Sequence, residues 1–230
     1  MSDARDLRRT NTGWLSRPER RLINSLAPRL PLSITPDRLT CMGFLGAVLA
    51  ALGYALVPCT IAALWLVNLA LVINWFGDSL DGAVARLRGI ARPRFGFFLD
   101  QAVDVASQAV FVAGLCLSGL VRTDVAAIGF ATHLMLTAHS LLHAQATGTF
   151  RLATGGIGLT EVRCIFFVAN AAFYIWPPVR FACAGTVCSY ADLLGVLIIA
   201  VNIFIFSAAL ILDLRRLSKI DQKSETEMRD

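Results

Sequence analysis

Six long apolar runs constrain this 230-residue chain more than any other feature of its sequence. A helix needs about 20 apolar residues to cross the hydrocarbon core of a bilayer. Hydrophobic residues make up 56% of the chain and charged residues only 16%, a balance that excludes a water-soluble globular protein and a disordered chain. We therefore predict an all-α integral membrane protein with six transmembrane helices. The predicted spans are Leu39–Val57, Ile61–Leu80, Gly96–Val121, Val125–Ala146, Val162–Pro177 and Tyr190–Leu214.

The basic residues predict how these helices are oriented. Of the 21 Lys and Arg residues, all except Arg122 and Arg180 lie at the termini, in the loops after the second and fourth runs or, for Arg163, at the start of the fifth run. The positive-inside rule then places both termini on the cytoplasmic side, and we expect a bacterial cell membrane. The basic residues behind the net charge of +5 would then face anionic lipid headgroups. No basic stripe with interleaved aromatic residues indicates a nucleic-acid partner.

The chain divides into three parts. Residues 1–38 form a basic cytoplasmic arm, and the mixture of arginines and apolar residues between Trp14 and Pro36 favours a short amphipathic helix in the membrane interface. A disordered basic tail is the alternative for this arm. Residues 39–214 form one membrane domain of six helices, and residues 215–230 form a cytoplasmic tail.

Four aspartates lie within the second and third runs or at their ends, although a carboxylate at a helix centre costs about 2.5–3.5 kcal/mol. Asp78 and Asp81 are spaced i, i+3, and Asp100 and Asp104 are spaced i, i+4, so each pair shares one helix face. A short loop joins the two helices, which brings both pairs together. Convergent carboxylates repel one another strongly in a low dielectric. Two divalent cations, Mg²⁺ or Mn²⁺, are therefore the predicted counter-charge.

The residues around these aspartates extend the pattern into a longer motif. The chain reads Asp78-Ser-Leu-Asp81-Gly82-Ala-Val-Ala85-Arg86 and, nine residues later, Gly96-Phe-Phe-Leu-Asp100-Gln-Ala-Val-Asp104. This motif resembles the signature of the CDP-alcohol phosphotransferases, DxxDGxxAR followed by GxxxDxxxD, and all eight signature positions match. The resemblance implies a six-helix membrane enzyme of phospholipid biosynthesis, usually a homodimer. Such an enzyme transfers a phosphoalcohol from a CDP-alcohol to an acceptor hydroxyl and releases CMP.

The same resemblance implies roles for individual residues. The four aspartates become metal ligands, and Asp104 becomes the candidate general base. Arg86 offers a planar fork that suits a diphosphate, and Gly82 leaves room for a nucleotide to approach the backbone. The implied contacts to the CDP-alcohol are Asp78, Gly82, Ala85, Arg86 and Gly96.

The acceptor side of the reaction is less defined. Thr147–Leu152 and Thr160–Arg163 are similar to a stretch of the choline and ethanolamine phosphotransferases, whose chains are longer and have more spans. Two donors stay open: CDP-diacylglycerol with a small polar alcohol as acceptor, or a soluble CDP-aminoalcohol with a lipid as acceptor. The acceptor-site candidates are Arg94, Arg151, Glu161 and Arg163. For Glu161 and Arg163, an interfacial ion pair is the alternative role.

A membrane transporter that uses the four aspartates as an ion or proton path is the alternative function. It predicts carboxylates near the midplane and paired repeats, whereas these acids lie near the cytoplasmic ends of two adjacent runs. The sequence also leaves two other features without an assigned role. His133, His139 and His143 lie on the fourth run, and Cys183 and Cys188 share a loop in which a disulfide is an open question.

Overall fold

The computed structural model describes residues 8–10, 12–183 and 185–227. The chain is mainly helical. Its helices are α1 (Ser16–Leu26), a 3-10 turn η1 (Ala27–Arg29), α2 (Pro36–Leu56), α3 (Ala63–Leu87), α4 (Pro93–Leu117), α5 (Thr123–Thr147), α6 (Leu159–Ile175) and α7 (Tyr190–Glu227). The strands are β1 (Arg8–Thr10), β2 (Thr149–Arg151), β3 (Ala153–Thr154), β4 (Ile157–Gly158), β5 (Arg180–Cys183) and β6 (Thr186–Ser189).

Within the described residues, five helices are long and apolar enough to cross a membrane: α2, α3, α4, α5 and α7. The prediction of an integral membrane protein is thereby supported, and five of the six predicted spans are matched. The remaining span, predicted at Val162–Pro177, corresponds to α6, which has 17 residues. It ends at Ile175 because a proline pair follows at 177–178. A six-span bundle therefore stays a prediction.

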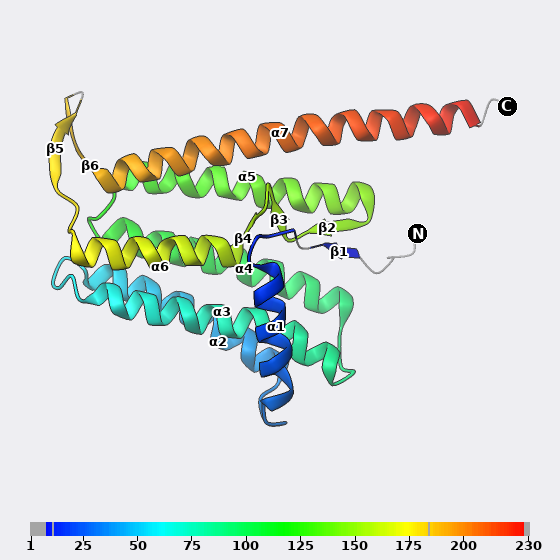
Figure 1. Ribbon diagram of the computed structural model, residues 1–230, viewed down its shortest axis with the longest axis horizontal. Helices are drawn as coiled ribbons and strands as arrows, with labels where there is room; N and C mark the ends of the chain where they lie inside the picture. Colours follow the sequence, from blue (N-terminus) through cyan, green and yellow to red (C-terminus); the bar gives the residue numbers. More distant parts are fainter. Residues whose placement is uncertain (1–7, 11, 184, 228–230) are drawn as a thin grey trace.

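Two helices end later than their apolar runs. Helix α3 continues to Leu87, so Asp78 and Asp81 lie inside a helix instead of at its end. Helix α7 has 38 residues and continues to Glu227, so much of the predicted tail is helical and extends past the bundle (Figure 1). No glycine or proline stands between Leu214 and Glu227 to end that helix.

Glycines allow α2 and α3 to touch along their backbones. A Cβ atom added to Gly77 would lie 2.3 Å from the backbone nitrogen of Gly43, and one added to Gly46 would lie 2.5 Å from the nitrogen of Asn74. The side-chain amide of Asn74 also donates to the Gly43 carbonyl at 2.8 Å. Small residues of this kind let membrane helices pack closely, so the α3 segment that carries Asp78 is fixed against α2.

We expect Gly77→Ala to separate α2 and α3, because the new methyl group has no space between the two backbones. Overpacking typically costs about 1–3 kcal/mol, which predicts a Tm lower by roughly 2–12 °C, measured by thermal unfolding in detergent. Gly129→Ala is the matched control, since its nearest neighbour would be Ile199 Cγ1 at 3.8 Å. Equal Tm values for the two variants would contradict the close-packing interpretation.

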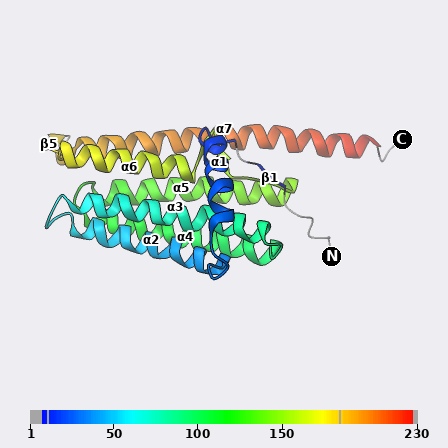
Figure 2. The same cartoon turned by 60° about the horizontal axis from the view of Figure 1, so that its bottom comes forward.

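Helix α1 of the N-terminal arm lies across the bundle instead of along it (Figures 1 and 2). Strand β1 pairs in parallel with β2, and the backbone nitrogen of Trp14 donates to the Gly156 carbonyl at 3.2 Å. On α1, Ile23 and Leu26 pack against a small buried cluster that includes Leu39 and Leu80. The arm is therefore attached to both halves of the chain.

The hairpin β5–β6 lies at the end of the bundle opposite to the C-terminus (Figure 1). Its register pairs Cys183 with Thr186 and Cys188 with Phe181. The side chain of Cys183 is outside the described part of the structure, so a bridge to Cys188 is not tested.

Candidate metal centre and nucleotide cavity

Three carboxylates from two helices meet on one side of the bundle. Among the described residues, Asp78 of α3 and Asp100 and Asp104 of α4 each offer an oxygen, and these oxygens lie within 4.8 Å of one another. All three side chains are partly buried. Oxygen-only ligands at this spacing suit a hard divalent cation such as Mg²⁺ or Mn²⁺. The predicted convergence of the two aspartate pairs is thus observed for three of the four residues.

The fourth aspartate, Asp81, lies beside this group with its oxygens engaged elsewhere. Its Oδ2 accepts a hydrogen bond from the Thr40 hydroxyl at 2.6 Å, and its Oδ1 accepts one from the Gly82 backbone nitrogen at 2.5 Å. Asp81 interacts electrostatically with Asp78 and Asp100. These hydrogen bonds hold one carboxylate of the signature toward α2.

Arg163 contributes the positive charge of the site. Its Nη2 donates to Asp78 Oδ2 at 2.6 Å, and its Nε donates to the Asn74 side-chain oxygen at 2.8 Å. Arg163 belongs to α6, so the ion pair connects a helix of the second half of the chain to the aspartates of the first half. Of the four predicted acceptor-site residues, Arg163 is the one in direct contact with the acidic group.

A cavity of about 1470 Å³ lies next to the carboxylates and is also bordered by α1 and the loop between α3 and α4. Arg94 lines this cavity as well, which places a second acceptor-site candidate at its rim. A second, mainly apolar cavity of about 400 Å³ is lined by Asp104 and Arg163. The acidic group therefore lies where the two cavities approach each other. The signature residues that line the larger cavity are Asp81, Gly82, Ala85, Arg86, Gly96 and Asp100.

The small signature residues keep this cavity open. Arg86 lies over Gly82, where an added Cβ atom would come within 3.2 Å of Arg86 Nη1. On the facing helix, an added Cβ atom at Gly96 would meet nothing within 4 Å. Of the residues that the motif assigns to the nucleotide, Gly82, Ala85, Arg86 and Gly96 line this cavity, whereas Asp78 is not among its lining residues.

Two acceptor-site candidates serve the packing of the chain in this structure. Glu161 is buried, and its carboxylate accepts hydrogen bonds from the backbone nitrogens of Leu15, at 2.8 Å, and Gly158, at 2.9 Å. Arg151 donates to both oxygens of Asp213 at 3.3 Å. Neither of these contacts involves the acidic group of Asp78, Asp100 and Asp104.

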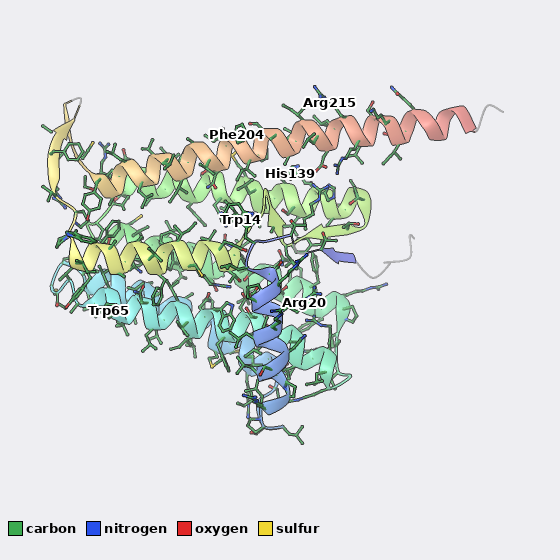
Figure 3. All side chains as sticks on the ribbon, in the orientation of Figure 1. Trp14, Arg20, Trp65, His139, Phe204 and Arg215 are labelled. Atoms are coloured by element: carbon green, nitrogen blue, oxygen red, sulfur yellow. The ribbon has the colours of Figure 1, made fainter. Side chains whose placement is uncertain are left out.

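Asp213 forms a second polar cluster that sequence analysis did not identify. His139 Nε2 and His143 Nδ1 lie 3.4 and 3.0 Å from Asp213 Oδ2, and Figure 3 shows His139 on α5 close to α7. Asp213 is 6% exposed, so Arg151, His139 and His143 replace water around the carboxylate. Because Asp213 comes just before Arg215 and Arg216, the sequence indicated a helix end there instead of a buried anion.

Comparison with known proteins decides which family this site belongs to. Residues 33–212 match the CDP-alcohol phosphatidyltransferase family, a span that contains every aspartate of the candidate metal centre. The chain belongs to the CDP-alcohol phosphatidyltransferase family. The predicted enzyme class is thus confirmed, and a transporter finds no support. Members of this family use divalent metal ions, in agreement with the oxygen-rich group of Asp78, Asp100 and Asp104.

Two curated relatives share the name archaetidylinositol phosphate synthase. The protein from Pyrococcus horikoshii is 36% identical over 139 residues, which cover 60% of this chain and 70% of the relative. The protein from Methanothermobacter thermautotrophicus is 34% identical over 162 residues, which cover 69% of this chain and 76% of the relative. Both relatives are archaeal, and the expected bacterial membrane stays a prediction.

Arg86→Lys tests the contact predicted between this family member and its donor. Lysine keeps the charge but loses the planar fork that binds two phosphate oxygens at once. Losing a charge-assisted hydrogen bond of about 1.5–3 kcal/mol predicts a donor KM raised roughly tenfold or more, with the acceptor KM unchanged. Steady-state CMP release measures both constants. An unchanged donor KM would refute a bidentate contact at Arg86.

Proposed function

We propose that this protein transfers a lipid-phosphate group from a CDP-linked lipid to a hydroxyl of inositol phosphate and releases CMP. The observation that carries the activity is the group of Asp78, Asp100 and Asp104 beside a cavity lined by the nucleotide signature. The relatives' name supports the substrate pair, since both are archaetidylinositol phosphate synthases. This choice favours the CDP-lipid donor over a soluble CDP-aminoalcohol.

The metal ions implied by the family fit the residues present. Asp78, Asp81, Asp100 and Asp104 would hold two Mg²⁺ or Mn²⁺ ions, because four carboxylates match the charge of two such ions. Bound there, such ions would neutralise the charge of the diphosphate and favour departure of CMP. Asp81 keeps one oxygen on Thr40 at 2.6 Å, which fixes the carboxylate while the other ligands adjust.

Three side chains of the protein carry the other roles in the proposed reaction. Arg86 binds the diphosphate of the donor from the wall of the larger cavity. Asp104 takes the proton from the acceptor hydroxyl. At the same time the hydroxyl oxygen of the acceptor bonds to the phosphorus, and the bond between the phosphorus and CMP breaks. Arg163 lines the same smaller cavity as Asp104, and its guanidinium can bind the phosphate of the acceptor close to that base.

The placement of the protein in its membrane follows from the same proposal. The donor and acceptor headgroups need access from water, which the predicted topology supplies because the loop between α3 and α4, on its cytoplasmic side, borders the larger cavity. The arm then lies in the interface, with the exposed Arg17 toward the headgroups. Both termini are cytoplasmic in this arrangement, and the enzyme acts as a homodimer, as its family resemblance implies.

The test is CMP release by the purified protein in liposomes with Mn²⁺ or Mg²⁺. One set of assays pairs CDP-diacylglycerol, or its archaeal ether counterpart, with inositol phosphate, inositol, glycerol phosphate or serine. The other set pairs CDP-choline or CDP-ethanolamine with diacylglycerol, and the Asp104→Asn protein serves as the blank. We expect CMP release that depends on inositol phosphate. Release only in the second set would overturn the proposed substrates.

A further inference from the structure

The N-terminal arm delivers a carboxylate to the helices that carry the site. On α1, one side of the helix lines the larger cavity, and Glu19 belongs to that side. Glu19 Oε1 accepts hydrogen bonds from Thr160 Oγ1 at 2.5 Å, Trp75 Nε1 at 3.0 Å and Ser79 Oγ at 3.4 Å. Trp75 and Ser79 belong to α3 and Thr160 belongs to α6. One carboxylate thus bridges two helices that are distant in the sequence.

This bridge lies next to the ion pair of the site. Ser79 follows Asp78 directly in α3, and Thr160 precedes Arg163 by one turn of α6. Glu19 also interacts electrostatically with Arg163, together with Asp78 and Asp104. The contacts of Glu19 therefore set the spacing of α3 and α6 one turn away from the 2.6 Å contact between Arg163 and Asp78.

A second carboxylate, which belongs to α6, accepts a hydrogen bond from the arm. Glu161 of α6 accepts from the backbone nitrogen of Leu15, which precedes α1, at 2.8 Å. Glu19 reaches from the arm to α6, and Glu161 reaches from α6 to the arm. Two such bonds restrict sliding of α1 over the bundle as well as its separation from it.

We propose that Glu19 is a positioning residue, which holds α6 against α3 so that the Arg163 guanidinium stays on the Asp78 side of the site. The arm is then a part of the catalytic unit in addition to its place at the membrane surface. This inference rests on the proposed function, since that proposal gives Asp78 and Arg163 their roles in the reaction.

Glu19→Gln keeps the shape and an acceptor oxygen but removes the charge. This weakens the charge-assisted bonds from Thr160, Trp75 and Ser79 and removes the attraction between position 19 and Arg163. We expect kcat to fall about tenfold, because misplacement of a catalytic group by about an ångström can cost up to 100-fold, while the donor KM changes less than twofold. Thr160→Val, which lacks the hydroxyl, should have a similar effect, and Thr160→Ser should restore the rate. Arg21→Gln, on the exposed side of the same helix, is the control and should match the wild-type rate.

A double-mutant cycle with Arg163→Lys separates positioning from a general structural role. If Glu19 acts through Arg163, then Glu19→Gln lowers kcat by less than twofold when Lys already occupies position 163. A purely structural role predicts the same fold-loss in both backgrounds and would overturn the proposal. Wild-type activity of Glu19→Gln, or a loss in Thr160→Ser as large as in Thr160→Val, would also overturn it.

The proposed substrates and the role of Glu19 can fail independently. If the wild-type protein releases no CMP in the presence of inositol phosphate, the proposed substrates are wrong. The same cycle is then measured by calorimetry of Mn²⁺ binding, which needs no acceptor and is sensitive to the contact of Arg163 with Asp78 at 2.6 Å. Non-additive changes in Mn²⁺ affinity for Glu19→Gln and Arg163→Lys would support the positioning role, and additive changes would overturn it.

Discussion

Asp100→Asn is expected to lower the rate of CMP release by more than about 100-fold and to raise the Mn²⁺ concentration needed for half-maximal activity. The substitution removes one of the carboxylates that lie within 4.8 Å of one another. Loss of a residue that merely supports a metal ligand typically costs 10–100-fold in metal affinity or activity, so loss of a ligand should cost more. Metal titrations of the steady-state rate measure both effects.

Asp124→Asn is the matched control for that experiment. Asp124 is an exposed acid in the first turn of α5 and pairs with Arg122 at 2.6 Å. Its substitution therefore makes the same change of side chain at a position outside the group of Asp78, Asp100 and Asp104. The control should keep the wild-type rate and metal response. Retained activity with an unchanged Mn²⁺ titration in Asp100→Asn would show that the metal centre has been assigned to the wrong residues.

Asp104→Asn is expected to stop transfer while the protein still binds CDP in the presence of Mn²⁺. A positioned general base typically contributes 10²–10⁴-fold to a rate, and the amide of asparagine cannot accept the proton in its place. Single-turnover CMP release gives the chemical rate, and calorimetry gives the affinity for CDP.

The contrast between Asp100 and Asp104 makes this second result informative. If Asp104→Asn also abolished Mn²⁺-dependent CDP binding, its main role would be that of a metal ligand and the base would have to be another group. A rate within tenfold of the wild type would exclude Asp104 as the base.

The transmembrane helices were predictable because lipid places a simple requirement on sequence. Each of α2 to α5 matches its apolar run to within seven residues at either end, since continuous apolar length decides what can cross a bilayer. The ends were less predictable because helices continue through polar residues. Arg86 and Leu87 still belong to α3, and Arg215 still belongs to α7.

The acidic part of the site was predictable from spacing, and its partners were not. Asp78 and Asp104 are conspicuous as charges within apolar runs. Glu19 stands among arginines in a polar arm, where a carboxylate is ordinary, and nothing local indicates that it bonds to Thr160 141 positions away. The pairing of Asp213 with Arg151 was not predicted for the same reason, since it depends on how β2 and α7 meet.

The long separation of the arm from its partners also governs the order in which the protein becomes competent during synthesis. Leu15 and Glu161 are 146 positions apart, so the ribosome completes α2 to α5 before the arm can make its contacts with α6. Every signature residue up to Asp104 already exists at that stage. A nascent chain that stops before α6 therefore carries the whole nucleotide motif and the contacts of the arm with α3, but it has neither Arg163 nor the contacts of the arm with α6. If Arg163 and Glu19 have the roles proposed above, the reaction begins only after α6 has inserted.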